Sequence, residues 1–183
     1  MRWRRLFDDL EAQAEAASAA ELEAEVAERS RREAALVHLR DRVAAAVGAA
    51  VTVHLPGAGQ VQGVLTDSGV DWLLLEERGA GEVLVPLAAL LGLTGVGAGT
   101  AVPDDSAVGR RLDLRWALRG LARSRTAVRL VLTDGSVLPG TLDRAGADHV
   151  DLAEHGRDEP RRAGAVRQVR LVPLTAVVAV RSG

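Results

Sequence analysis

The feature that most constrains this sequence is an internal duplication. Residues 53–75, VHLPGAGQVQGVLTDSGVDWLLL, are matched 77 positions later by residues 130–152, LVLTDGSVLPGTLDRAGADHVDL. After Gly156 the second copy gains ten residues, and Val85-Pro86-Leu87 then matches Val172-Pro173-Leu174 at an offset of 87. A chain that carries the same pattern twice is expected to build the same folding unit twice.

Within each copy, short apolar runs alternate with turns rich in Gly and Pro, which predicts a meander of five strands. Helical patterns at residues 31–47 and 108–124 precede the two meanders at the same offset. Glycines at the turns and within strands are the device by which small barrels bend and close. We therefore expect a mainly β protein with some α structure, in which two tandem five-stranded small β-barrels each follow a helix.

The predicted domain organisation follows the repeats. Residues 1–30 are expected to form an acidic N-terminal helical arm, and residues 31–93 the first barrel with its leading helix. Residues 94–106 have the sequence TGVGAGTAVPDDS, which is typical of a Gly/Pro linker. Residues 107–183 are expected to form the second barrel with its leading helix.

The repeated unit resembles the Sm-like family, which includes bacterial Hfq. The resemblance is carried by the pattern V.L..G....G.L...G.D...L and a closing VPL, at Val51, Leu55, Gly63, Leu65, Asp71 and Leu75 and again at Val128, Leu132, Gly140, Leu142, Asp148 and Leu152. It implies a bent barrel of the Sm or SH3 kind, oligomerisation and RNA binding. Trp72 and His149 stand where that family often has Asn, so its nucleobase pocket is not implied here. The opening MRWRRLFDDLEAQ also resembles a protein family of high-GC Gram-positive bacteria.

The amino-acid composition excludes several kinds of functional site. There is no cysteine, which excludes disulfides, thiolate metal sites and a Cys nucleophile. The longest apolar stretch, at residues 83–93, is too short to span a bilayer, and the start does not resemble a signal peptide. We expect a cytoplasmic protein without a membrane partner. All 23 basic residues are Arg, and the net charge of −2 combines an acidic front half with a mildly basic back half.

The helix predicted in front of the second barrel is the main candidate site. Arg111, Arg115, Arg119 and Arg123 lie four residues apart and form one stripe, and Trp116 lies nearby. A guanidinium stripe beside a Trp suits a phosphate backbone and a stacked base. The insertion in the second copy adds Arg161, Arg162 and Arg167 to this candidate nucleic-acid site. The stripe is also compatible with a solvated face or with a protein partner.

The N-terminal arm carries a second candidate surface. Trp3, Leu6, Phe7 and Leu10 fall on one helical stripe and are expected to form an interface. The acidic residues from Glu11 to Glu28 suit a further hypothesis, in which the arm mimics phosphates, covers the Arg stripe and inhibits binding. Unchanged nucleic-acid affinity after deletion of residues 1–29 would contradict it.

The two copies differ on one strand face. The first copy has Trp72 and Leu74 where the second has His149 and Asp151. An apolar face is typical of a buried contact, so Trp72 and Leu74 are predicted interface residues in the copy that serves assembly. Open edges of the meanders favour strand pairing within a chain or between chains. We therefore also expect self-association or a protein partner.

No pattern typical of catalysis stands out. His149 and His155 lie on one predicted strand about 20 Å apart, at about 3.3 Å per residue, which does not suit a shared metal ion. We expect no cofactor, no metal, no small-molecule substrate and no enzymatic activity. The predicted function is RNA or single-stranded nucleic-acid binding by a Sm-like protein. The alternative is a protein-interaction or oligomerisation scaffold that does not bind nucleic acid.

Overall fold

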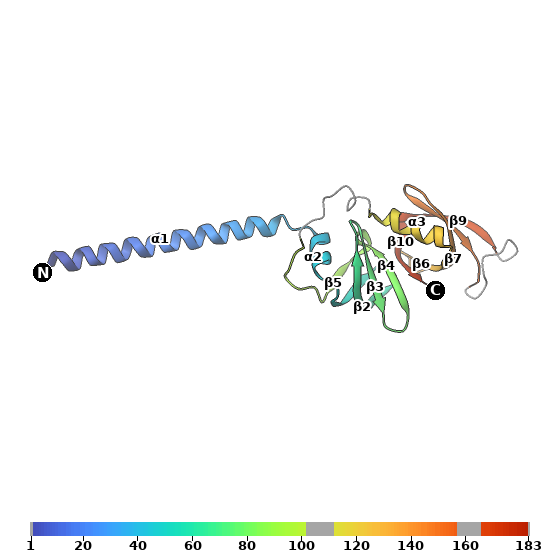
Figure 1. Cartoon of the computed structure of the whole chain (residues 1–183), viewed down its shortest axis with the longest axis horizontal. Coiled ribbons are helices and arrows are strands. Elements are labelled where there is room, and N and C mark those ends of the chain that lie inside the picture. Colours follow the sequence, from blue (N-terminus) through green and yellow to red (C-terminus); the bar gives the residue numbers. More distant parts are fainter. Residues whose placement is uncertain (1, 102–111, 157–165, 183) are drawn as a thin grey trace. The chain divides into compact units, whose positions relative to one another are not determined.

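The structure is a computed structural model that describes residues 2–101, 112–156 and 166–182. The chain divides into two units, Met1–His38 and Leu39–Gly183, and each is described by itself. The first unit consists of helix α1, Arg2–Ala35 (Figure 1). This helix continues past the predicted end of the arm at residue 30, because the Ala-, Glu- and Arg-rich composition of high helix propensity runs on to Ala35. No described helix has an apolar stretch long enough to cross a bilayer.

The second unit is mainly β, as the repeated meanders predicted. Its first repeat comprises α2 (Leu39–Ala45), β1 (Ala50–Leu55), β2 (Gly59–Ser68), β3 (Trp72–Glu77), β4 (Gly81–Pro86), η1 (Leu87–Ala89) and β5 (Gly92–Thr94). Its second repeat comprises α3 (Leu114–Ser124), β6 (Ala127–Leu132), β7 (Val137–Ala145), β8 (His149–Glu154), β9 (Gln168–Pro173), η3 (Leu174–Ala176) and β10 (Val177–Ser182). The described residues therefore form five strands in each copy.

The strands form one open antiparallel sheet in the order β5-β1-β2-β3-β4-β10-β6-β7-β8-β9. The prediction of two closed five-stranded barrels is therefore wrong. A closed barrel would need β4 to pair with β5 and β9 with β10, whereas β4 pairs with β10 of the other repeat. The backbone groups along the free edge of β4 form hydrogen bonds with β10 of the second repeat. We call this strand pair the β4–β10 joint. It joins the two meanders into one sheet.

Two glycines that match at the offset of 77 set the close approach of neighbouring strands. A Cβ atom at Gly63 would lie 2.6 Å from the Glu76 carbonyl oxygen, and one at Gly140 would lie 2.3 Å from that of Ala153. Neither distance leaves room for a side chain, so glycine is required where β2 and β7 cross the next strand.

The two hydrophobic cores each take side chains from both repeats. The core of the first repeat includes Val131, Val178 and Ala179 from the second. The core of the second repeat includes Trp72 and Leu84 from the first, with Leu74 packed against it. Trp72 and Leu74, the residues predicted to form an interface, therefore lie in the contact between the repeats of one chain. This exchange makes residues 39–183 a single folding unit.

Candidate nucleic-acid interface

Helix α3 positions the candidate site, and its start is fixed by two aspartates. Asp113 caps the helix, because its carboxylate accepts a hydrogen bond from the Trp116 backbone N–H at 2.8 Å. Asp71, on the turn before β3, accepts another from the Leu114 N–H at 2.6 Å. The Trp72 indole donates to the Leu112 carbonyl at 2.9 Å. The first repeat thus holds the N-terminus of the helix of the second.

The two aspartates differ in their pKa shifts. Burial raises the pKa of Asp71 above its ordinary value, although the hydrogen bond from Leu114 opposes this effect. Partial burial alone would also raise the pKa of Asp113. The hydrogen bonds from Trp116 and Arg115, with the charges of Arg115 and Arg119, outweigh burial and hold that pKa below its ordinary value. Asp113 is therefore ionised under neutral conditions and is a counter-ion to the start of the Arg stripe.

Of the predicted stripe, Arg115, Arg119 and Arg123 lie on the exposed side of α3, while Leu114, Leu118 and Ala122 face the core. Arg115 is held by Asp113 at 2.6 Å, and Arg119 lies 3.9 Å from the same carboxylate. Among the described residues, Arg123 has no ion-pair partner. Trp116 is 44% exposed. It precedes Arg123 by seven residues, two turns or about 10.5 Å along the helix.

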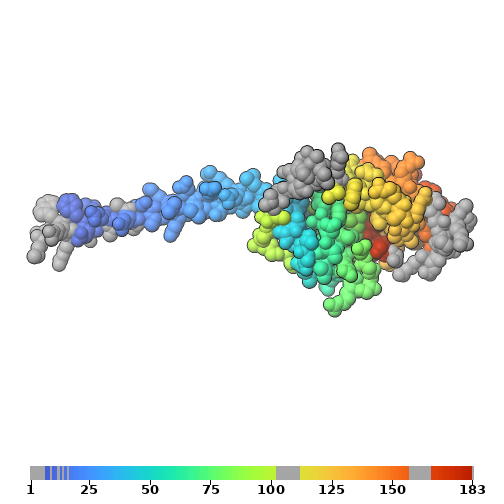
Figure 2. Space-filling model, viewed as in Figure 1, coloured from blue at the N-terminus to red at the C-terminus, as the bar shows by residue number. Residues whose placement is uncertain are grey.

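The C-terminal half of α3 forms one wall of a groove. Arg119, Arg123, Arg125, Asp143 and Arg144 line it together with Ala122 and Ala145, and its volume is about 390 Å³. We call this the Arg groove. Residues of α3, yellow in Figure 2, are exposed on the face shown. The groove brings four guanidinium groups and one carboxylate together, so it carries a net positive charge.

Two of these arginines were missed by the sequence analysis. Arg125 takes a left-handed backbone conformation (φ 55°) that ends α3, and its guanidinium lies 2.9 Å from Asp143. Arg144 lies on β7 and is 3.5 Å from Asp151. Only the packing of α3 against β7 brings Arg144 beside the helix, and no sequence pattern identifies which strand residue lies there.

Of the other predicted arginines, the described Arg115 and Arg167 do not line this groove. Arg111, Arg161 and Arg162 lie outside the described residues, as do the side chains of Trp3 and Leu6 in the arm. Arg167 precedes β9, where its backbone N–H donates to the Glu154 carbonyl at 2.9 Å. The guanidinium of Arg170 is the main cause that holds the pKa of Glu154 below its ordinary value, and Arg167 adds a smaller effect. In the arm, Phe7 and Leu10 are exposed.

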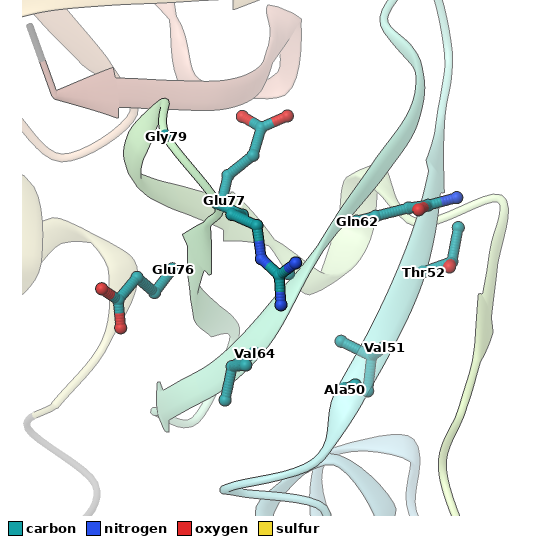
Figure 3. Close-up of a pocket in the computed structure, with 10 residues that line it drawn as sticks. Ala50, Val51, Thr52, Gln62, Val64, Glu76, Glu77 and Gly79 are labelled. Atoms are coloured by element: carbon teal, nitrogen blue, oxygen red, sulfur yellow. The ribbon is translucent and has the colours of Figure 1, made fainter.

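The first repeat carries a larger but acidic hollow, of about 620 Å³, on its strands β1, β2 and β3. Figure 3 shows Thr52 and Gln62 on neighbouring strands and Glu76 and Glu77 at the other side of this hollow. At the corresponding place in the second repeat, Pro139 and His155 line a space of only about 10 Å³. The buried His155 occupies the second-repeat position of Arg78. Two carboxylates disfavour a polyanion in the first hollow, so the Arg groove is the better candidate for phosphate binding.

The histidines do not assemble a metal site. Among residues 2–101, 112–156 and 166–182, no group of three His, Cys, Asp or Glu side chains is placed to hold a metal ion. His149 contacts Asp148 at 2.8 Å and Asp151 at 3.7 Å. His155 instead contacts the Thr141 hydroxyl at 2.9 Å within the core.

Comparison with known proteins gives no further guide to the site. No model of a known protein family matches this sequence, and no curated protein matches it. The Arg groove is therefore interpreted from its own geometry and charge.

Proposed function

We propose that this protein binds RNA or another single-stranded nucleic acid through the Arg groove. The observation that carries the proposal is the convergence of Arg119, Arg123, Arg125 and Arg144 on one groove. Guanidinium groups pair with phosphate oxygens in a planar, two-pronged geometry, which makes Arg well suited to a nucleic-acid backbone.

Trp116 supplies the second element of the proposed site. Its exposed indole lies on the same side of α3 as Arg119 and Arg123, three and seven residues further on. An aromatic ring next to a line of positive charge is the usual means by which proteins bind single strands without reading their sequence. The proposed contact is therefore phosphates in the groove and a base stacked on Trp116.

In this proposal the protein is a binding protein and not an enzyme. It acts in the cytoplasm, where RNA is present. The proposal rests on residues of α3 and β7 and does not require closed barrels. The resemblance to Sm-like proteins, which implies RNA binding, is compatible with it. That likeness remains a proposal.

The test is the affinity for a fluorescently labelled 20-nucleotide single-stranded RNA, measured by anisotropy between 50 and 300 mM salt. Each phosphate contact to a single strand contributes about 0.7 to the slope of log affinity against log salt. For four arginines, three of them already paired with aspartates, we expect a slope between about −0.7 and −3. Affinity that does not change with salt would favour the alternative, a protein-interaction scaffold.

Three variants assign the binding to the groove. Arg123→Ala should reduce the slope by about 0.7, whereas the matched Arg78→Ala in the acidic hollow should leave it unchanged. Trp116→Ala should lower affinity by about 1–3 kcal/mol with little change in slope, because stacking does not release counterions. Equal effects of Arg123→Ala and Arg78→Ala would contradict binding in the groove.

A further inference from the structure

In the β4–β10 joint, the backbone hydrogen-bonding groups at the edge of one repeat pair with those at the edge of the other. Leu84 of β4 lies opposite Val180 of β10, and Val83 opposite Arg181. The joint buries an apolar side chain from each strand, since Leu84 is 6% exposed and Val178 is fully buried. Leu84 lies in the core of the second repeat and Val178 in that of the first, so each strand of the joint contributes a buried side chain to the other repeat.

The duplication gives the chain a second copy of both sides of this joint. At the offset of 87, β9 corresponds to β4 and β5 corresponds to β10. The register agrees, because Leu93 pairs with Val53 in the first repeat as Val180 pairs with Leu130 in the second. On the other side, Leu75 pairs with Val83 as Leu152 pairs with Arg170. β5 and β9 are the two outer strands of the sheet (Figure 1).

The buried side chains Leu84 and Val178 have exposed counterparts on β9 and in the residue just before β5. Leu171, the counterpart of Leu84, is 66% exposed, and Leu91, the counterpart of Val178, is 72% exposed. Val169 on β9 is also exposed. Outer strands of stable monomers usually carry charges or prolines that prevent pairing. β9 carries Arg170 and Pro173, but Arg170 is paired with Glu154 and Pro173 corresponds to Pro86 of β4, which forms the joint. The exposed leucines at both edges therefore favour pairing.

We propose that a second copy of this chain docks head to tail, so that β9 of one molecule pairs antiparallel with β5 of the next. The register of the β4–β10 joint places Leu171 opposite Leu93 of the next molecule, and Arg170 opposite Thr94. Each molecule keeps one free edge of each kind, so the contact is heterologous and repeats until it closes into a ring or grows into a filament.

The contact between molecules differs in charge from the joint within one chain. Across the joint, Arg181 pairs with Glu77 and the Ser182 hydroxyl accepts from the Glu82 N–H at 3.1 Å. The corresponding positions of β5 are Thr94 and Gly95, which provide neither interaction. The association therefore relies on apolar side chains and backbone hydrogen bonds, and raising the salt concentration should not weaken it. This behaviour is opposite to that of the proposed RNA binding, on which the inference does not depend.

The experiment is a mixing test with two edge variants, Leu171→Asp on β9 and Leu91→Asp beside β5. Mass is measured by sedimentation and light scattering over a range of concentrations. The wild-type protein should exceed its monomer mass of 19.2 kDa increasingly with concentration. Each variant alone should be monomeric, and their equimolar mixture should form a dimer, because each retains the edge that the other lacks. Val137→Asp, an exposed position on β7, is the matched control and should associate like the wild type.

Several outcomes would overturn the proposal. One is a wild-type protein that stays monomeric at all concentrations. Another is Leu91→Asp that still dimerises alone while the mixture gains nothing, because this would indicate pairing of two β9 strands. A third is association that is lost on deletion of residues 1–35 and kept by both edge variants, which would assign it to the arm. Circular dichroism of each variant establishes that it is folded.

The register is tested separately by cross-linking, for which the absence of cysteine provides a clean background. Oxidation of a mixture of Thr94→Cys and Arg170→Cys should give a covalent dimer. Thr94→Cys with Gln168→Cys, two residues out of register, should give much less. A reversed preference would contradict the proposed pairing.

Discussion

At the residue scale, Asp113 links the stability of α3 to the charge of the Arg groove. Its carboxylate caps the helix and also holds Arg115. Because its pKa is lowered in the folded protein, ionised Asp113 stabilises the fold above its ordinary pKa of 3.8, and this stabilisation is lost as the pH falls through the lowered value. The same charge opposes a phosphate that approaches Arg115 or Arg119.

Substitution of Asp113 should separate these two roles. Asp113→Asn keeps a good capping side chain and removes the negative charge, so near pH 7 it should lose the charge-dependent part of the stabilisation and keep the cap. RNA affinity at low salt should rise about fivefold, since two charges at a surface interact by about 1 kcal/mol. Asp113→Ala should raise affinity similarly and lower the free energy of unfolding by about 1 kcal/mol. Anisotropy and urea unfolding measure the two effects, and weaker binding by Asp113→Asn would contradict this role.

At the element scale, α3 is fixed by residues of the other repeat. Trp72 is 5% exposed and packs among Leu84, Leu114 and Leu118. The sequence places His149 at the same position of the second repeat, where the side chain lies between Asp148 and Asp151. Duplicated positions thus serve different purposes: the first copy packs a helix and the second faces polar neighbours.

The matched pair Trp72→Ala and His149→Ala should show this difference. Loss of the buried indole should cost about 3–5 kcal/mol of unfolding free energy. Loss of the imidazole should cost about 1 kcal/mol or less, because surface ion pairs contribute little. Urea unfolding followed by circular dichroism measures both. Similar costs would mean that α3 does not depend on the first repeat.

Asp71, which accepts a hydrogen bond from the first residue of α3, gives a prediction that depends on pH. Its raised pKa means that the folded state disfavours the ionised carboxyl, so this group makes the protein less stable as the pH rises from 3.8 through the raised value. Asp71→Asn removes that penalty and can still accept from the Leu114 N–H. The variant should be more stable than the wild type at pH 7, and the difference should shrink toward pH 4. Thermal unfolding at both pH values tests this, and a less stable variant at pH 7 would indicate that the charged hydrogen bond dominates.

At the scale of the whole molecule, residues 39–183 should unfold as one cooperative unit. Each core contains side chains of the other repeat, so neither repeat can keep its core when the other unfolds. A chain divided into residues 1–106 and 107–183 should yield two fragments without stable tertiary structure, which regain it when mixed. Near-ultraviolet circular dichroism follows this recovery. Two fragments that each unfold cooperatively on their own would contradict the exchange of core residues.

The sequence by itself determined the duplication, the number of strands, their turns and the exposed Arg stripe. These properties depend on residues close together in the chain. The alternation of apolar residues predicts the strands, Gly63 and Gly140 mark close approaches between strands, and the four-residue spacing of arginines predicts the stripe on α3. Only the tertiary structure decided that β4 pairs with β10 and that Arg144 lies beside Arg123. The sequence pattern of a strand specifies which face is buried, but both edges of every strand offer the same backbone groups. The choice of partner therefore depends on the whole set of contacts, and the β4–β10 joint replaced the closure of two barrels.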